Sequence, residues 1–251
     1  ELLNHKVLCA DETSLQVLHE TGRKAQSKSF MWLYRTGRDG PPIVLFDYKE
    51  TRAGKHPKKF LSGFKGYLQV DGYSGYSMIP GVTLVGCWAH ARRKFDEALK
   101  VLPIEKRLVP STAREGLEFC NKLFDIEREI SDASPEERYN IRLNKSRPIL
   151  DEFALWLFEQ SHKVLPNGLL GKAVSYCLNQ WHKLDKFLLD GELEIHNNRS
   201  EGSIRPFVVG RKGWLFCNTP RGARASAVVY SIVETAKENS IVYMHFHFTL
   251  L

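Results

Sequence analysis

The hydrophobic pattern of this chain changes twice along its length, and this limits the possible folds more than any single motif does. Near the N-terminus, short apolar runs are separated by turn residues, which is typical of strands. A long middle stretch has apolar residues at helical spacing, and the last stretch is compact and basic. We therefore expect an α/β fold whose mixed sheet is built from residues 1–97 and 191–251. An all-helical insertion is expected at residues 98–190.

The same pattern predicts individual elements. Apolar runs predict strands at residues 7–10, 30–34, 43–47, 67–71 and 82–87. In the last segment, residues 210–213 fit a basic turn, 214–217 a short strand, and 223–237 a helix with one apolar face. The apolar end at 241–251 fits a strand, or a terminus outside its natural context.

The composition is that of a globular chain. Of the 251 residues, 43% are hydrophobic, enough for one large domain or two small ones. No apolar run approaches the roughly 18 residues that a membrane span needs, so we expect no membrane partner. Five widely spaced cysteines favour free, buried thiols in a reducing cytoplasm. Because the chain begins at Glu1 rather than Met, we expect a fragment or a domain of a longer protein.

The positive charge is confined to particular segments. Residues 98–190 hold 14 basic and 14 acidic side chains, whereas the flanking segments hold 22 basic and 15 acidic ones. The flanking segments therefore account for the whole net charge of +7. Such an excess indicates a polyanionic partner, most simply nucleic acid. A solvated basic surface is the alternative.

Three carboxylates are candidate metal ligands. Asp11 and Asp71 lie where predicted strands end, and Glu201 lies at the start of a predicted helix. If they converge on one point, they need cations between them, because like charges repel. Carboxylate oxygens suit Mg²⁺ or Mn²⁺. Two such ions about 4 Å apart can activate a nucleophile and stabilise the leaving oxygen of a phosphodiester.

Each carboxylate also has a structural interpretation. Asp11 and Asp71 fit turn residues, which often follow strands. Glu12 is next to Asp11, and spacing does not exclude it as the relevant acid. Glu201 fits the glutamate of a capping box that begins at Asn198, and it is spaced to pair with Arg205.

Several motifs occur in a defined order along the chain. They are ADET at 10–13, QVDGY at 69–73, CWAHARRKF at 87–95, NNRSEGSIRP at 197–206, GRKGWLF at 210–216 and YSIVETAK at 230–237. Together they resemble the transposases of the insertion sequence 66 family. The resemblance covers about residues 6–240, and the shared order makes it specific.

The resemblance implies an RNase H-like fold with a DDE triad formed by Asp11, Asp71 and Glu201. These residues are 60 and 130 positions apart, and the longer separation fits a core interrupted by the helical insertion. It further implies Mg²⁺ or Mn²⁺ as cofactor, with two ions at the site. The implied partners are double-stranded DNA, at transposon ends and target, and further copies of the chain on that DNA. The implied location is the bacterial cytoplasm, in association with the nucleoid.

Basic residues and one tryptophan near these motifs are candidate DNA contacts. The candidates are His90, Arg92, Arg93, Lys94, Arg205, Arg211, Lys212, Trp214, Arg221 and Arg224. Basic groups around a carboxylate site fit a polyanionic substrate, and a tryptophan can stack on an unpaired base. A solvated helix face is the less favoured alternative for Arg92 to Lys94, whereas core packing is the favoured explanation of Trp214. Cys87 and His90 supply only half of a structural zinc site, so Cys87 is expected in the core.

The expected activity is metal-dependent nicking of DNA, followed by transfer of the freed 3′-hydroxyl to target DNA. Two alternatives remain open from the sequence. One is an RNase H-like nuclease that cuts without joining. The other is a catalytically inactive transposase remnant that only binds DNA.

Overall fold

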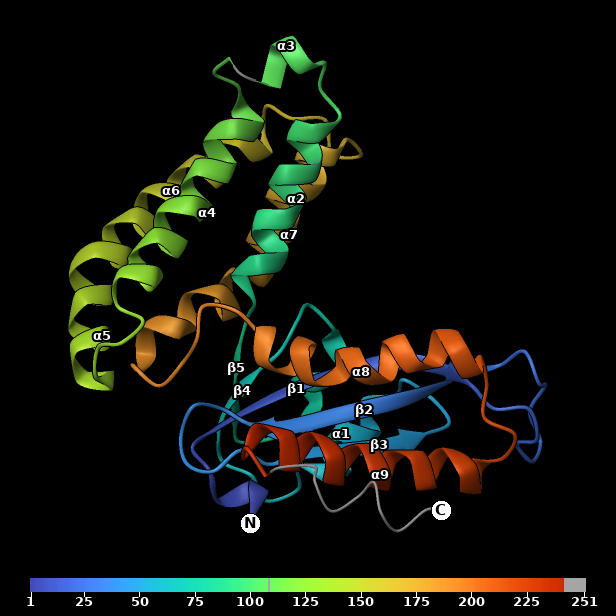
Figure 1. Cartoon of the computed structure of the whole chain (residues 1–251). Coiled ribbons are helices and arrows are strands. Elements are labelled where there is room, and N and C mark those ends of the chain that lie inside the picture. The colour runs from blue at the N-terminus through green and yellow to red at the C-terminus, as the bar shows by residue number, and fades with distance from the viewer. Residues whose placement is uncertain (108, 242–251) are drawn as a thin grey trace. The chain divides into compact units, whose positions relative to one another are not determined.

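The computed structural model describes residues 1–107 and 109–241 (Figure 1). They form two compact units, which are described separately below. The first unit combines residues 1–83 with those from 198 onward, and the second comprises residues 84–197. The predicted helical segment, 98–190, falls within the second unit. Apart from Ile241, the predicted apolar end at 241–251 lies outside the described residues.

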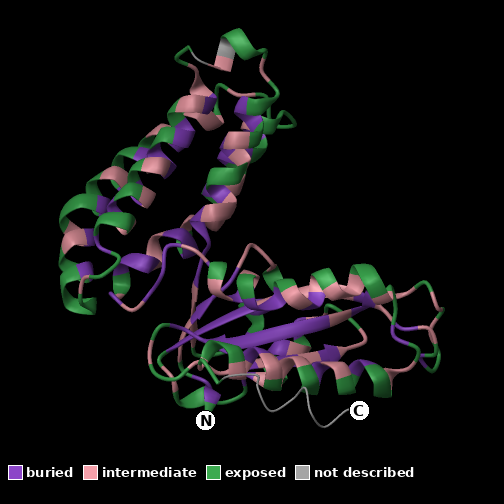
Figure 2. Cartoon of the chain, in the orientation of Figure 1, coloured by how far each residue is buried: buried purple, intermediate pink, exposed green. Residues whose placement is uncertain are grey.

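A five-stranded mixed sheet forms the centre of the first unit. Its strands are β1 (Val7–Gln16), β2 (Lys28–Thr36), β3 (Val44–Lys49), β4 (Gly66–Gln69) and β5 (Val82–Val85). The spatial order is β3-β2-β1-β4-β5. β1 pairs antiparallel with β2, β2 antiparallel with β3, and β1 parallel with β4. Each of the five strands predicted between residues 7 and 87 has a counterpart in this sheet, although β4 and β5 end two residues before the predicted positions, and the strands are largely buried (Figure 2).

β1 is longer than predicted. The sequence indicates a strand that ends at Ala10, but β1 continues to Gln16 through several polar residues. The reason is a tertiary partner: β2 pairs with β1 from Leu8 to Gln16, so the ladder hydrogen bonds hold the polar stretch extended. Asp11 therefore lies within a strand, and its interpretation as a turn residue is wrong.

Two long helices cover one face of the sheet. They are α8 (Asn198–Trp214) and α9 (Pro220–Glu238), drawn in orange and red in Figure 1. Leu33 of β2, Phe46 of β3 and Phe207 of α8 belong to the hydrophobic core beneath them. Phe46 and Phe207 have ring centroids 6.1 Å apart. The aliphatic and aromatic side chains of this core therefore fix α8 against the sheet.

The opposite face carries two short helices. These are α1 (Lys55–Phe60) and the 3-10 helix η2 (Ser74–Met78). The Tyr34 ring stacks on Phe60 with centroids 3.9 Å apart, and the Trp32 ring meets Tyr76 edge-on at 5.8 Å. Tyr34 and Trp32 alternate with Leu33 along β2, so they point to the other side of the sheet. The two faces thus have separate cores.

The end of α8 differs from the sequence-based expectation. Residues 210–213, predicted as a turn, are helical, and α8 continues to Trp214. The helix ends at Trp214, and the next residue, Leu215, has a φ of 63° in the left-handed region. The predicted strand at 214–217 is also wrong, because only Cys217 forms a β-bridge, with Val17 of the chain's first segment. Trp214 lies beyond Gly210 and Gly213 and packs against Phe207, which favours continuation of the helix through these two glycines.

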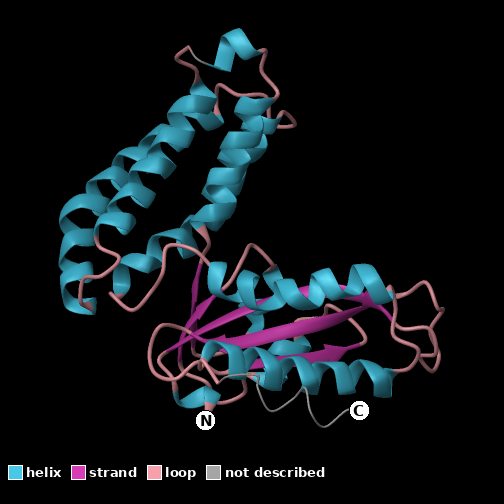
Figure 3. Ribbon diagram, viewed as in Figure 1, coloured by secondary structure: helices cyan, strands magenta, loops and turns pink. Residues whose placement is uncertain are grey.

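The second unit is almost entirely helical (Figure 3). Its helices are α2 (Trp88–Lys100), α3 (Ile104–Arg107), α4 (Thr112–Glu129), α5 (Pro135–Ile141), the π-helical turn η3 (Arg142–Ser146), α6 (Arg147–Ser161), α7 (Leu169–Leu184) and η4 (Asp185–Leu189). Phe153 packs among Phe95, Phe119 and Trp181 at its centre. In the described part of the chain, no helix combines the length and apolarity that a membrane crossing requires.

Candidate active site

The parallel pairing of β1 with β4 brings Asp11 and Asp71 together. Cys9 of β1 lies opposite Gln69 of β4. Asp11 and Asp71 each follow two residues later, so this register places them side by side, and adjacent strands are about 4.8 Å apart. Asp71 Oδ1 accepts a hydrogen bond from the Tyr73 backbone N–H at 2.9 Å. This Asx-type turn holds the Asp71 carboxylate just beyond the end of β4.

Glu201 reaches the same region from α8. Asp11 lies opposite Leu33 of β2, so both side chains point to the face that α8 covers. Two residues further along β1, Thr13 Oγ1 accepts a hydrogen bond from Arg211 of α8 at 3.2 Å. Glu201 lies in the first turn of this helix. The side of β1 that carries Asp11 therefore faces the helix that carries Glu201.

The pKa of Asp11 is affected by its burial and by the neighbouring acids. The pKa of Asp11 is raised from 3.8 to about 8. Burial is the largest cause, and the negative charges of Glu12, Asp71 and Glu201 each raise this pKa further. A hydrogen bond from the Glu12 backbone N–H, at 2.8 Å, acts in the opposite direction. The cluster thus favours a positive charge beside Asp11, either a proton or a cation.

This donor set fits a divalent metal ion. Carboxylate oxygens are the hard ligands that Mg²⁺ and Mn²⁺ prefer, and a bound cation offsets both the burial and the repulsion that raise the pKa of Asp11. Asp11, Asp71 and Glu201 supply three carboxylates from three separate segments of the first unit. The arrangement is therefore suited to hold cations next to an anionic substrate.

Glu12 has a different environment, although it follows Asp11 directly. It points to the opposite face of β1, where its side chain is only 1% exposed. Its Oε1 accepts a hydrogen bond from Arg52 Nε at 2.8 Å, and its Oε2 accepts one from Tyr76 Oη at 2.5 Å. Burial is the main cause of a raised pKa for Glu12. Because both of its oxygens have protein donors, the geometry favours Asp11 over Glu12 as a metal ligand.

The predicted basic contacts of the first unit lie on α8 and α9. Arg205, Lys212, Arg221 and Arg224 are exposed, and Arg211 is half-buried through its bond to Thr13. Arg224 also approaches Glu50, with 4.0 Å between Nη2 and Oε1. These positions leave charged groups available to a polyanion on the α8–α9 face.

Trp214 packs inside this unit. Its ring meets Phe207 edge-on with centroids 5.4 Å apart, and it lies partly buried against the hydrophobic core. This contact favours the packing interpretation of Trp214 over base stacking.

The other predicted contacts lie on α2 of the second unit. Arg92 and Arg93 are exposed, and Arg92 Nε donates a hydrogen bond to Asn121 Oδ1 at 2.7 Å. Lys94 Nζ lies 5.0 Å from the centroid of the Tyr176 ring. His90 follows Cys87 by one helical turn. Cys87 is buried, as expected for a core thiol, and its Sγ accepts a hydrogen bond from a backbone N–H at 3.3 Å.

Sequence reasoning missed Arg35, a guanidinium that is only 1% exposed. Its Nη1 donates to the Arg199 carbonyl at 3.2 Å and to Ser203 Oγ at 2.6 Å, on either side of Glu201. The guanidinium also forms two hydrogen bonds with Glu238 of α9. The available signal was an arginine that continues a strongly apolar strand, because a charge in such a place needs buried partners.

Comparison with known proteins identifies the family. The sequence model described as "Transposase IS66 family" matches residues 1–225. The chain is 32% identical over 218 residues to the uncharacterized protein y4hP of Sinorhizobium fredii (strain NBRC 101917 / NGR234). It is 32% identical over 248 residues to the uncharacterized protein y4qI and 30% identical over 242 residues to the uncharacterized protein y4jD of the same organism.

These matches cover 82%, 92% and 91% of the chain, but only 40%, 44% and 46% of the respective relatives. The chain thus spans less than half the length of the curated relatives that it matches. No solved structure matches it. Because the family model covers most of its length, the chain belongs to the Transposase IS66 family.

Proposed function

We propose that this chain is the catalytic domain of a DDE transposase that nicks DNA and joins the new end to a target. The observation that supports the proposal is that, after burial and Glu12, the negative charges of Asp71 and Glu201 raise the pKa of Asp11, although the three acids are far apart in the sequence. Membership of a transposase family supplies the class of reaction. The proposed substrate is double-stranded DNA, at the ends of the mobile element and at the target.

The proposed architecture is an RNase H-like core with a helical insertion. The order β3-β2-β1-β4-β5, with antiparallel β1 to β3 and parallel β4, supports this fold. The proposed insertion, residues 98–190, separates the strand that precedes Asp71 from the helix that carries Glu201. In this scheme, residues 1–97 and 191–251 form the two parts of the core.

In the proposed site, Asp11, Asp71 and Glu201 hold divalent cations, most simply two ions of Mg²⁺ or Mn²⁺. When bound, such ions activate an attacking hydroxyl and stabilise the leaving oxygen of a phosphodiester. In the first reaction, water attacks phosphorus and the bond to the 3′-oxygen breaks, which leaves a 3′-hydroxyl. In the second, that hydroxyl attacks phosphorus of a target phosphodiester, the target bond from phosphorus to its 3′-oxygen breaks, and a target 3′-hydroxyl is released.

Basic side chains position the substrate in this proposal. Arg205, Arg211 and Lys212 contact phosphates beside the carboxylates, and Arg221 and Arg224 extend the positive surface along α9. On the second unit, His90 and the run Arg92 to Lys94 contribute further contacts. Trp214 is left out of this set, because it packs on Phe207. We further propose that several copies act together on DNA in the bacterial cytoplasm, in association with the nucleoid.

A nicking assay with matched variants tests the catalytic assignment. Asp11→Asn, Asp71→Asn and Glu201→Gln should each abolish Mg²⁺-dependent nicking, because the amide keeps the shape but loses the charge that holds the cation. DNA binding should persist in all three variants, and Asp71→Asn and Glu201→Gln should tighten it, since each of these two changes removes a negative charge near phosphate. Without metal, Asp11→Asn should also raise the melting temperature, because a buried and repelled carboxylate is removed.

The outcomes separate this proposal from its alternatives. If the unaltered protein nicks DNA but does not join strands, it is a nuclease. If it binds DNA but does not nick it, it is an inactive remnant. If Glu201→Gln cuts at the parental rate, Glu201 is not a metal ligand. Glutamine also serves in a capping box, so a purely structural Glu201 predicts this silent result.

A further inference from the structure

The segment from Lys49 to Lys65 is the most basic part of the first unit that the proposed site leaves unused. Its six Lys and Arg residues are opposed by a single acid, Glu50. It contains α1, on the face of the sheet opposite α8 and α9. We define the α1 basic surface as Lys49, Lys55, His56, Lys58 and Lys59.

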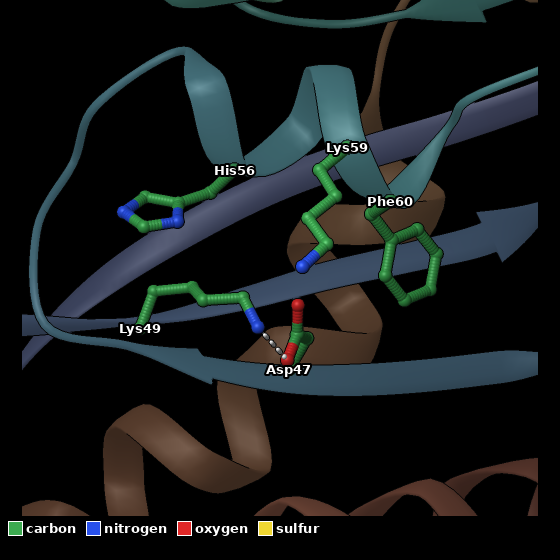
Figure 4. A pocket seen from close by; sticks show the side chains of 5 residues that line it. All are labelled: Asp47, Lys49, His56, Lys59 and Phe60. Atoms are coloured by element: carbon green, nitrogen blue, oxygen red, sulfur yellow. Dashed lines mark ion pairs between the residues drawn. The ribbon is translucent and has the colours of Figure 1, made fainter.

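A cavity opens within the α1 basic surface (Figure 4). It has a volume of about 440 Å³ and is lined by Asp47, Lys49, His56, Lys59 and Phe60. The side chains of Lys49 and Lys59 point toward Asp47 in Figure 4, and Lys49 Nζ forms an ion pair with Asp47 Oδ1 at 2.9 Å. Two ammonium groups against one carboxylate leave an excess positive charge. Such a lining suits a phosphate-sized anion.

The exposed lysines around this cavity are not neutralised by the protein. Within residues 1–107 and 109–241, Lys55, Lys58 and Lys59 form no ion pair, and all of them are exposed. The pKa of His56 is lowered, first by burial and then by the charges of Lys49 and Lys55. The region therefore carries a positive potential. A polyanion would relieve the mutual repulsion of these side chains.

Direct contacts connect the α1 basic surface to the candidate active site. Tyr73, whose N–H binds Asp71, lies 6.3 Å from the Trp32 ring between centroids. The same Trp32 ring lies 6.4 Å from His56. Arg52, just before α1, stacks over Tyr73 at 4.1 Å from the ring centroid. Packed side chains therefore join the turn that carries Asp71 to His56 in the cavity wall.

We propose that the α1 basic surface is a second DNA-binding surface, which holds the duplex that continues from the carboxylate cluster, with one backbone phosphate in the cavity. The proposal rests on the function proposed above, because it extends the same substrate. The recognised chemistry is the phosphate backbone, so no base sequence is read at this surface. Asp47 keeps Lys49 in place and limits the net charge of the cavity.

Salt-dependent binding of the whole chain to a duplex of about 30 base pairs tests this proposal, and the measurements omit divalent metal. The triple variant Lys55→Ala, Lys58→Ala and Lys59→Ala should lower the slope of log K against log salt by about 2 to 3, since each lost phosphate contact contributes about 0.9. Alanine favours helix, so the melting temperature should change little. Asp47→Asn should tighten binding, because it removes a negative charge that faces the phosphate.

A charge-matched triple variant in the second unit provides the control. Lys145→Ala, Lys163→Ala and Lys172→Ala remove the same charge from exposed positions, and the slope should fall by less than in the α1 variant. Asp132→Asn is the matched control for Asp47→Asn. An unchanged slope in the α1 variant, or an equal fall in the control, would overturn the proposal. Nicking of DNA by the unaltered protein in Mg²⁺ is measured separately, and its absence would contradict the proposed function rather than the α1 basic surface.

Discussion

Arg35 of β2 donates a hydrogen bond to Ser203 Oγ at 2.6 Å, two residues beyond Glu201 on α8. The same buried guanidinium binds the Arg199 carbonyl at 3.2 Å and both carboxylate oxygens of Glu238, at 2.9 and 3.1 Å. It therefore ties the first turn of α8 to the sheet and to the end of α9. Because Glu201 lies between the two contacted residues of α8, we infer that Arg35 positions its carboxylate.

Replacing Arg35 should impair the site more than DNA binding. Arg35→Lys keeps the positive charge but loses the planar guanidinium that forms several of these hydrogen bonds at once. We expect this change to lower the free energy of unfolding by about 2 to 4 kcal/mol. Below its melting temperature, the variant should have a reduced kcat for nicking and a nearly parental DNA affinity. Ser203→Ala, which removes one of these bonds, should cost about 1 kcal/mol and cause a smaller loss of rate. Parental kcat in folded Arg35→Lys would contradict a positioning role.

Glu12 provides a direct comparison with Asp11, because the two neighbours point to opposite faces of β1. Glu12→Gln should retain metal-dependent nicking within about tenfold, whereas Asp11→Asn should abolish it. The Glu12 change should alter stability by less than about 1 kcal/mol, since glutamine can still accept from Tyr76 and the exposed Arg52 can be solvated. Nicking rates and melting curves of both variants provide the test. Loss of nicking in Glu12→Gln with retained folding would make Glu12 part of the metal site.

The Arg35–Glu238 pair predicts a pH dependence of stability. Hydrogen bonding from Arg35 is the main cause that lowers the pKa of Glu238 below its ordinary 4.5. A lowered pKa in the folded state stabilises the protein above pH 4.5, and this contribution is lost as the pH falls through the folded value. The free energy of unfolding should therefore fall less steeply below about pH 5 in Glu238→Gln than in the parent. Denaturant titrations across this range measure the difference, and parallel curves would exclude the linkage.

Arg211 and Lys212 are predicted to contribute to DNA binding on the α8 side. Arg211→Ala with Lys212→Ala should lower the salt slope of DNA binding by up to about 2. Loss of the bond to Thr13 should cost only about 0.5 to 1.5 kcal/mol of stability. Fluorescence anisotropy at several salt concentrations, with a melting curve for each variant, provides the measurements. A parental slope would show that this pair does not contact phosphate.

Local pattern was sufficient to locate most of the secondary structure. Apolar runs predicted every strand of the sheet, because strands buried on one or both faces need such runs. Helical spacing predicted the helical middle of the chain, and ordered motifs indicated the family. The errors fell where distant partners override local preference. Polar residues after Ala10 remain extended because β2 pairs with them, and the packing of Trp214 on Phe207 favours a helix at residues 210–213.

The sequence by itself therefore determined which residues are acidic candidates and which elements carry them. Only the tertiary structure distinguishes the surroundings of Asp11 from those of Glu12, because these depend on which face of β1 meets α8. It also decided that Asp71 lies beside Asp11, through the pairing of Cys9 with Gln69. The sequence likewise did not indicate the hydrogen-bond partners of Arg35, since they lie more than 160 positions away along the chain. Strand register, side-chain direction and burial arise from contacts between distant segments, and no local pattern encodes them.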